Sequence, residues 1–391
     1  MSNPSDSWKQ RALLCYYRYR SYHLQLKFLT NPVAPLLKQY RSYFLPSHYR
    51  YYRALVQGSS SPANGKEKIA LLDFTTPLLD FDGGRYFVLL LRSLRDAGYR
   101  VLIQDNFSFL AGSIRKSLKK QFFEQQDYEI VSLADSSLPR GCLRFCDRRL
   151  GNHRAAKTVR LCRIRGKRPL RLGDNELWWP YPALQRPTSL EVDRGKQRGR
   201  RVLFAGNVVP QYHSKDIKDH RLLSRLEIMW SLLDSGLPLQ EYAEEGLPAK
   251  EREPAVHVPR FDRKQNRTVH YVPYSQWLPL LSSADFFIVA PGTRMPFAHN
   301  VVEAMLCGTI PIIEYDRYFY PPLCDGENAL CFQGKAGLIE AVERALAMDA
   351  KTLEKLRAGV LEYYQQHLDF ARFAERLEHH AAREVLVRFY A

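Results

Sequence analysis

The residue pattern with the clearest chemical meaning lies in the range 290–313. An apolar segment that ends at residue 290 predicts a buried strand, and a loop with Gly292 and Arg294 follows it. Asn300 then stands three residues before Glu303, which is the spacing of a capping box at a helix N-terminus. Backbone amides at a helix N-terminus favour phosphate, and an arginine adds a bidentate cation. The stretch therefore predicts a phosphate-binding loop.

Two side chains in this stretch each have a structural and a functional interpretation. Glu303 either caps its helix through the amide of Asn300 or accepts hydrogen bonds from ribose hydroxyls. His299 is either an ordinary loop histidine or a donor to a phosphate. The spacing by itself does not separate these alternatives.

Two successive strand–helix–strand patterns must position this loop. The expected elements are a strand over 69–74, a glycine turn over 80–84, a helix over 85–97 and a strand over 100–104, and then strands over 202–205, 268–272 and 285–290 with a helix over 221–233. Each order is typical of a βαβ unit and therefore of a parallel sheet. Parallel α/β sheets bind ligands at the carboxyl ends of their strands, so we expect the phosphate-binding loop at such an edge. The final stretch, 353–390, is helical in pattern and carries no evident chemistry.

The composition limits the class of protein and its partners. A chain of 391 residues is expected to form two domains. The net charge of +17 predicts an anionic partner, which is nucleic acid, an anionic membrane surface or a phosphorylated small molecule, although a solvated basic surface explains it equally. No apolar run approaches the roughly 20 residues of a membrane-spanning helix. The start lacks the shape of a signal peptide, and the seven scattered cysteines form no zinc pattern, so we expect reduced thiols in a cytoplasmic protein.

Residues 1–66 differ from the rest of the chain, because basic residues and tyrosines are interleaved there. The segment contains a single acidic residue, Asp6. Aromatic side chains combined with cations suit a membrane surface or stacked nucleic acid bases. The structural alternative is a set of helices packed on the main body, with the stems of arginine and lysine lying along it.

A family resemblance rests on the second half. The stretch His299-Asn-x-x-Glu-Ala-Met-x-x-Gly308, followed by an apolar strand with Pro311, resembles the nucleotide-sugar site of GT-B glycosyltransferases, and its Pro-Gly … Glu-Ala … Gly-x-x-Pro order is similar to that of exostosin-like members. The segment 271–285 also resembles their C-terminal domain. Asp82-Gly-Gly-Arg85 resembles the glycine turn of their N-terminal domain.

The resemblance implies a role for each matching residue. Glu303 would hold the ribose, Tyr274 would lie in the loop that touches the base, and Gly83 and Gly84 would bring backbone amides close to the donor. The residues implied to cradle the diphosphate or donor sugar are Gly292, Thr293, Arg294, His299 and Asn300. Those implied for the first strand of the second domain are Gly206 and Asn207 for close approach, and Lys215, Lys218 or Arg225 for neutralising phosphate.

One position departs from the family pattern. Many retaining members carry a first glutamate eight residues before the equivalent of Glu303, and Met295 stands there in this chain. An inverting mechanism needs a general base for the acceptor hydroxyl, and the candidates are Asp82 and Asp80, each of which is otherwise a turn or capping aspartate. Asp80 and Asp82 also form a D-x-D triplet, which resembles the metal-binding signature of the other large glycosyltransferase fold. The match covers only three residues and runs directly into the glycine turn, so we do not interpret it as a metal site. We therefore expect no metal and no cofactor, since fixed positive charge would stabilise the leaving diphosphate.

These observations favour an α/β chain with two Rossmann-like domains facing a cleft (GT-B) and a basic N-terminal extension. The expected parts are the extension over 1–66, an acceptor domain over 67–190, a nucleotide-sugar domain over 200–350, and C-terminal helices over 351–391 that pack back on the first domain. The expected function is sugar transfer from a nucleotide-sugar to a glycan or lipid-linked acceptor, in bacterial surface polysaccharide or lipopolysaccharide synthesis at the inner face of the cell membrane. The alternatives are a non-catalytic protein that binds nucleic acid or membrane, and a phosphorylase or epimerase on the same fold. Of the anionic partners, nucleic acid is the least expected, because no recognised nucleic-acid-binding module is present.

Overall fold

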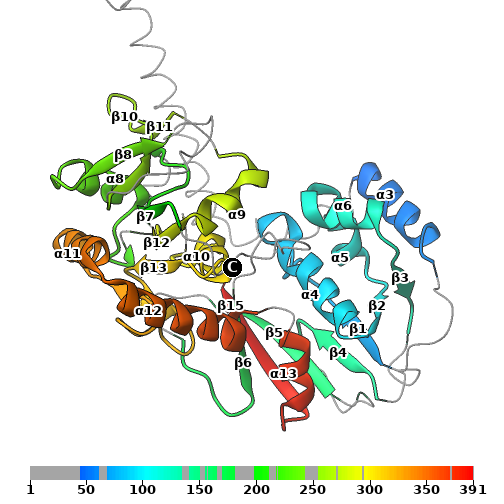
Figure 1. Ribbon diagram of the computed structural model, residues 1–391. Helices are drawn as coiled ribbons and strands as arrows, with labels where there is room; N and C mark the ends of the chain where they lie inside the picture. The colour runs from blue at the N-terminus through cyan, green and yellow to red at the C-terminus, as the bar shows by residue number, and fades with distance from the viewer. Residues whose placement is uncertain are drawn as a thin grey trace, which may run out of the picture.

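The computed structural model shows two parallel sheets with helices on their faces (Figure 1). The described residues are 45–60, 68–133, 141–149, 155, 157–164, 170–180, 198–210, 217, 219–242, 254–269, 272–292, 295–369 and 372–390. In this part of the chain no helix is both long enough and apolar enough to cross a membrane. The predicted α/β class with two Rossmann-like sheets is confirmed.

The first sheet has seven strands in the order β3-β2-β1-β4-β5-β15-β6, and all of its pairs are parallel. Its strands are β1 (Ile69–Asp73), β2 (Arg100–Gln104), β3 (Glu129–Val131), β4 (Leu143–Cys146), β5 (Lys157–Ile164), β6 (Glu176–Trp179) and β15 (Glu384–Tyr390). From β1 the chain proceeds to β2 and β3 on one side and then crosses to β4 on the other. The β1–β4 junction is therefore the point where the strand order reverses, which is where such sheets bind ligands.

Helices cover this sheet because their apolar residues face its core. They are α3 (Pro46–Gln57), the short 3-10 helix η2 (Asp82–Gly84), α4 (Arg85–Asp96), α5 (Phe107–Ala111), the 3-10 helix η3 (Gly112–Arg115), α6 (Ser117–Gln125) and α13 (Phe373–His379). Helix α4 buries most of its length against the sheet. Helix α3, which falls within the range 1–66, packs on the same body, where Leu55 is buried and the Tyr52 hydroxyl donates to Asp105 at 2.8 Å.

The second sheet has six parallel strands in the order β14-β13-β12-β7-β9-β8. They are β7 (Arg200–Leu203), β8 (Leu239–Tyr242), β9 (Val256–Pro259), β12 (Ala284–Ile288), β13 (Ile310–Ile313) and β14 (Leu330–Cys331), and a short hairpin of β10 (Phe261–Asp262) and β11 (Arg267–Thr268) lies beside them. The strand order reverses between β7 and β12. The chain that precedes the predicted phosphate-binding loop is therefore a central strand at the switch point.

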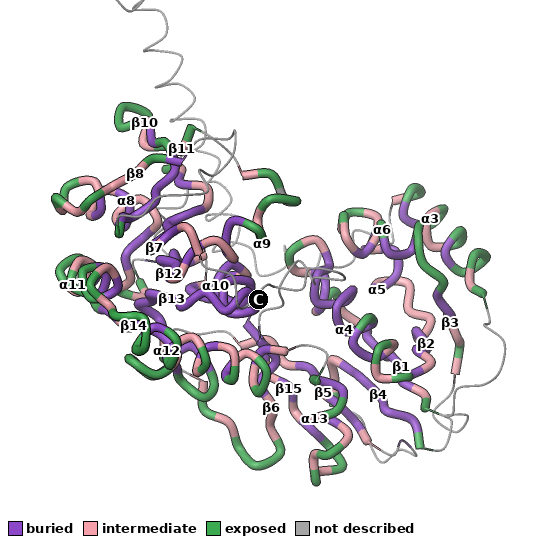
Figure 2. Tube along the Cα trace, viewed as in Figure 1, coloured by how far each residue is buried: buried purple, intermediate pink, exposed green. Residues whose placement is uncertain are grey.

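The helices of this half are α8 (Arg225–Leu233), α9 (Tyr274–Ser282), α10 (His299–Leu306), the 3-10 helix η6 (Asp316–Tyr318), α11 (Gly334–Ala347), α12 (Ala350–Tyr363) and the π-helical turn η7 (Tyr364–Leu368). Helix α8 contacts α11, and α10 contacts α9 and α12. In Figure 2 the strands are buried while α11 and α12 keep an exposed side. Strand β12, helix α10 and strand β13 therefore lie deep in this half, where they carry the candidate site.

The prediction of a wholly helical C-terminal stretch is wrong, because Glu384–Tyr390 forms strand β15. Val385, Val387 and Phe389 are fully buried and alternate with more exposed neighbours, which is the period of a strand. The strand returns to the first sheet and pairs in parallel with β5 and β6 (Figure 1). Its Tyr390 stacks on Phe297 of the second half at 5.9 Å, so the two halves are in contact next to the candidate site.

Candidate functional site

Two glycines shape the carboxyl edge of the second sheet at the β7–β12 junction. Gly206 follows β7 and has a φ of +122°, a conformation that favours glycine. Gly292 follows β12, and a Cβ atom there would lie 2.6 Å from the carbonyl oxygen of Met295. Its amide donates to the Pro296 carbonyl at 3.1 Å, so the loop folds back tightly on itself. Both loops need glycine for reasons of backbone geometry.

Arg225 joins these two loops. It is the first residue of α8, whose N-terminus is held by a capping box between Ser224 and Glu227. Its Nε donates to the Pro291 carbonyl at 3.1 Å and its Nη1 donates to the Asn207 carbonyl at 3.4 Å. The structure therefore places a fixed positive charge at the switch point, beside both loops that the sequence had singled out.

Asn207 is held in turn by the hairpin of β10 and β11. Its Oδ1 accepts a hydrogen bond from the Thr268 hydroxyl at 3.2 Å, and that hydroxyl also accepts from the Val208 amide at 3.4 Å. The loop after β7 is thus bound on one side by Arg225 and on the other by Thr268. Sequence reasoning did not identify Thr268, because the contact spans 61 residues.

The predicted capping box at Asn300 is wrong. Helix α10 begins at His299 with Ala298 as its N-cap, and the Asn300 Oδ1 accepts from the Val301 amide at 2.9 Å instead. The chain just before the helix is anchored by Phe297, which is buried and stacks on Tyr390 of the first sheet. This anchor depends on a distant strand, which local spacing does not reveal.

Glu303 is fully buried and forms a cluster with His299 and Trp277. Its Oε2 accepts from the Trp277 Nε1 at 2.7 Å and lies 2.8 Å from the His299 Nδ1. The Glu303 side chain is 0% exposed, whereas the His299 side chain is 38% exposed. Of the two predicted donor-site residues, the histidine therefore faces outward and the glutamate lies behind it.

In the first half, the two candidate bases have different surroundings. Asp80 is buried and pairs with Lys119 at 2.9 Å, and burial lowers the pKa of the Lys119 ammonium although Asp80 opposes the change. Asp82 is 42% exposed and pairs with Arg85 at 2.8 Å. A base must reach the hydroxyl that it deprotonates, so the geometry favours Asp82 over Asp80.

The glycine turn of the first half is filled by the chain itself. Gly83 and Gly84 have φ values of +68° and +90°. A Cβ atom on Gly84 would lie 2.5 Å from the Lys119 Cβ, and one on Gly83 would lie 2.8 Å from the Ser117 Oγ. The close approach that needs glycine here is therefore that of helix α6, which gives these two residues a packing role beside the predicted donor contact.

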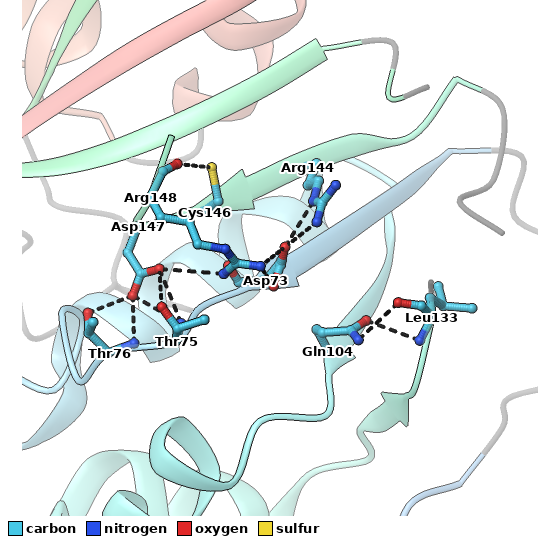
Figure 3. A network of polar contacts seen from close by, with 9 residues as sticks. All are labelled: Asp73, Thr75, Thr76, Gln104, Leu133, Arg144, Cys146, Asp147 and Arg148. Atoms are coloured by element: carbon cyan, nitrogen blue, oxygen red, sulfur yellow. Dashed lines mark hydrogen bonds and ion pairs between the residues drawn. The ribbon is translucent and has the colours of Figure 1, made fainter. Parts of the chain in front are cut away.

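The β1–β4 junction of the first sheet carries a charged network that sequence reasoning missed (Figure 3). Asp73, at the end of β1, accepts from the Arg144 Nε and the Arg148 Nη2, both at 3.0 Å. Asp147 accepts from the backbone amides and hydroxyls of Thr75 and Thr76 at 2.6–3.1 Å. A cavity of about 240 Å³ lies beside the network. The signal in the sequence that could have pointed to this network is Asp73, a charged residue at the end of an otherwise apolar strand.

A larger cavity of about 850 Å³ lies at the carboxyl ends of β13 and β14. Its lining includes His220, Glu314, Asp316, Tyr318, Glu340 and Arg344. Glu314 accepts from the amides of Leu223 and Gly334 at 2.6 and 2.7 Å, and burial raises the pKa of its carboxyl group. This glutamate ties the chain just before α8 to the start of α11.

Three predicted donor-site residues, Lys215, Thr293 and Arg294, lie outside the described residues, as do Lys218 and the side chain of Tyr274. The structure therefore brings together Gly206, Asn207, Arg225 and Gly292 at one junction, and it places His299, Asn300 and Glu303 on α10. Within the described part of the chain, no group of three or more histidine, cysteine, aspartate or glutamate residues is arranged to hold a metal ion.

No family model and no curated protein matches the chain. Among solved structures it is similar to the N-terminal domain of trehalose-6-phosphate phosphatase from Candida albicans, with 9% identity over 83% of this chain and 99% of that chain and a TM-score of 0.43. It is also similar to T4 phage β-glucosyltransferase, with 12% identity over 79% of this chain and 99% of that chain and a TM-score of 0.34. The same holds for HepE of Anabaena in complex with UDP, with 11% identity over 80% of this chain and 100% of that chain and a TM-score of 0.37. These TM-scores lie below 0.5, so the likenesses bear on neither the substrate nor the mechanism of this chain.

Proposed function

We propose that this protein is a GT-B glycosyltransferase that binds a nucleotide-sugar donor at the β7–β12 junction. The observation that carries the proposal is the Arg225 guanidinium, which is hydrogen-bonded to both loops of a topological switch point. Parallel α/β sheets bind ligands at such points, and a guanidinium suits phosphate oxygens. The resemblance of the stretch 299–311 to nucleotide-sugar sites supports the same assignment.

The proposed chemistry is displacement of a nucleoside diphosphate from the donor sugar by an acceptor hydroxyl. Fixed positive charge from Arg225 stabilises the leaving diphosphate, and His299, Lys215, Thr293 and Arg294 complete its cradle. The donor is a substrate, and the proposed reaction needs neither metal ion nor cofactor. Asp82 is the proposed base of an inverting reaction, because its carboxylate is the more exposed of the two candidates.

The acceptor is proposed to bind the first half, at the cavity beside Asp73 and Arg148. Carboxylate, guanidinium and hydroxyl groups lie side by side there and match the alternating donors and acceptors of a sugar. A glycan or lipid-linked acceptor of a bacterial surface polysaccharide or lipopolysaccharide is the proposed class.

The net charge of +17 supports a membrane-surface location for such an acceptor. Helix α3 supports the same location, because one of its sides exposes Tyr49, Arg50, Arg53 and Val56. Aromatic and apolar side chains next to arginines suit the boundary of an anionic bilayer. We propose peripheral attachment at the inner face of the cell membrane.

A thermal-shift screen with UDP, GDP, CMP and ADP tests the donor proposal. A nucleotide that binds only the folded protein raises the unfolding free energy by about 2.7 kcal/mol at a hundred times its Kd. One nucleotide class should raise Tm, and Arg225→Met should abolish most of the shift. Arg92→Met, on the exposed side of α4, is the matched control.

Absence of any shift, together with salt-sensitive binding to nucleic acid or anionic liposomes, would instead support the non-catalytic alternative. Retention of the full shift in Arg225→Met would place the nucleotide elsewhere, with the 850 Å³ cavity as the next site to examine.

A further inference from the structure

In the cluster of Glu303, His299 and Trp277, the glutamate is the buried residue and the histidine is the exposed one, which the family resemblance alone does not imply. Glu303 lies on α10 with no exposed side-chain surface, and its Oε2 is 2.7 Å from the Trp277 Nε1 and 2.8 Å from the His299 Nδ1. Trp277 comes from α9, where its ring packs edge-on against Phe287 of β12 at 6.2 Å. The carboxylate is therefore buried at the contact between α9 and α10, and the imidazole is its more exposed neighbour.

The chemistry of a buried carboxylate fixes the histidine ring. Burying a charged carboxylate is costly unless hydrogen bonds and an opposite charge compensate it. The Trp277 Nε1–H donates to the Glu303 Oε2, so this oxygen is an acceptor, and the His299 Nδ1 beside it is assigned the hydrogen that points to it. The other ring nitrogen, Nε2, is then the atom left to contact a ligand. Glu303 thus sets the orientation and the tautomer of His299. In functional histidines, the hydrogen bond of one ring nitrogen commonly sets the role of the other nitrogen.

We infer that Glu303 is a positioning residue for His299 and does not hold the ribose. This inference rests on the proposed donor site, because it assigns the His299 Nε2 to the diphosphate of the bound nucleotide. A ribose ligand must present an oxygen atom at the surface, and a fully buried side chain does not. The His299 ring then lies between the buried carboxylate of Glu303 and the proposed diphosphate.

Binding of three kinds of probe by calorimetry separates the two roles. The probes are UDP and GDP, their 2′-deoxy forms, and inorganic pyrophosphate, which has no ribose. Glu303→Gln should lower the affinity for all three kinds by a common factor of roughly 10- to 100-fold, the range for losing a hydrogen bond to a charged group. His299→Ala should do the same, and the double variant should be no weaker than His299→Ala alone, because the two residues act as one unit.

Selective weakening of the ribonucleotides by Glu303→Gln, with pyrophosphate and the deoxy forms unchanged, would overturn the inference and restore the ribose role. Wild-type protein that binds none of the probes would overturn the inference and the proposed donor site together. If Glu303→Gln does not fold, Glu303→Asp keeps the charge, shortens the side chain and is expected to give the same pattern.

The ¹⁵N chemical shifts of the His299 imidazole report its tautomer. They would not depend on Glu303 if this glutamate only stabilised the fold. In the wild type, the His299 Nδ1 should appear as the protonated nitrogen in the absence of ligand, and addition of pyrophosphate should shift the Nε2 signal. The tautomer preference should be lost in Glu303→Leu, which removes the acceptor, and retained in Trp277→Phe, which keeps the Glu303–His299 pair. An Nδ1 that carries no proton in the wild type would contradict the inference.

Discussion

At the β1–β4 junction of the first sheet, charged side chains bind one another, whereas at the β7–β12 junction of the second sheet, glycines and backbone carbonyls lie around Arg225. Asp73 pairs with Arg144 and Arg148 at the first junction. Gly292 and Arg225 define the second. Both junctions occupy the position where α/β sheets bind ligands, but they are built from different groups.

Stability and ligand binding are therefore expected to depend on different junctions. Charges that neutralise each other inside the protein are mainly needed for folding, since removal of one partner leaves the other uncompensated. Glycines that permit a tight loop are needed for the shape that a ligand meets. We therefore expect substitutions near the first junction to reduce stability and substitutions at the second to reduce nucleotide affinity.

The largest expected effect is at Lys119, whose ammonium is buried against Asp80 in the first half. Lys119→Met should lower the free energy of unfolding by about 3–5 kcal/mol, because Asp80 remains as an unpaired buried charge. Urea unfolding measures the loss, and the double variant Asp80→Leu/Lys119→Met should recover much of it. A loss of nucleotide affinity at unchanged stability would contradict the division of roles between the two junctions.

Gly292→Ala tests the second junction. The added Cβ would lie 2.6 Å from the Met295 carbonyl oxygen, so the loop must shift, at about 1–3 kcal/mol in unfolding free energy. The nucleotide-induced rise in Tm should also be smaller in this variant than in the wild type. Gly173→Ala is the matched control, because its nearest atom would be 3.9 Å away and neither quantity should change. Equal effects of the two variants would remove the special status of the loop after β12.

Acid stability offers a third test, through His257 on β9 of the second sheet. Burial, with a smaller contribution from Arg200, lowers the pKa of this histidine from 6.5 to about 4. The unfolded chain therefore takes up the proton first as the pH falls, and this contribution to stability is complete above pH 6.5 and lost toward pH 4. Unfolding free energies should fall by about 2 kcal/mol between pH 7 and pH 5 from this group alone. His257→Leu should show a correspondingly smaller loss, and an identical pH profile would exclude this cause.

The smallest expected effect is at Thr268, which supports the loop after β7 through Asn207. Thr268→Val removes the hydroxyl and keeps the shape, so the unfolding free energy should fall by about 0.5–1.5 kcal/mol. Nucleotide affinity should fall by less than in Arg225→Met, because the arginine still holds Asn207 through its backbone. An affinity loss larger than that of Arg225→Met would make the hairpin, and not the arginine, the main support of the site.

Local periodicity was enough to predict the two parallel sheets and several of their elements. The strands over 69–74 and 285–290 and the helix over 85–97 are found at nearly those positions as β1, β12 and α4. Their apolar residues recur with the period of the element that they form, and glycine or proline follows where the chain turns. The position of the loop after β12 at a strand's carboxyl end followed from the same patterns.

Tertiary structure alone decided which side chains meet. Asp73 and Arg144 are 71 residues apart, and only the parallel pairing of β1 with β4 brings them together. The C-terminal strand β15 joins the first sheet although more than 200 residues separate it from β5 and β6. Burial of Glu303 behind His299, and the anchoring of Phe297 just before α10, likewise depend on distant elements. Periodicity is a local property of the chain, whereas charge pairing and burial are properties of the packed molecule, so the sequence determined the elements and packing decided the site.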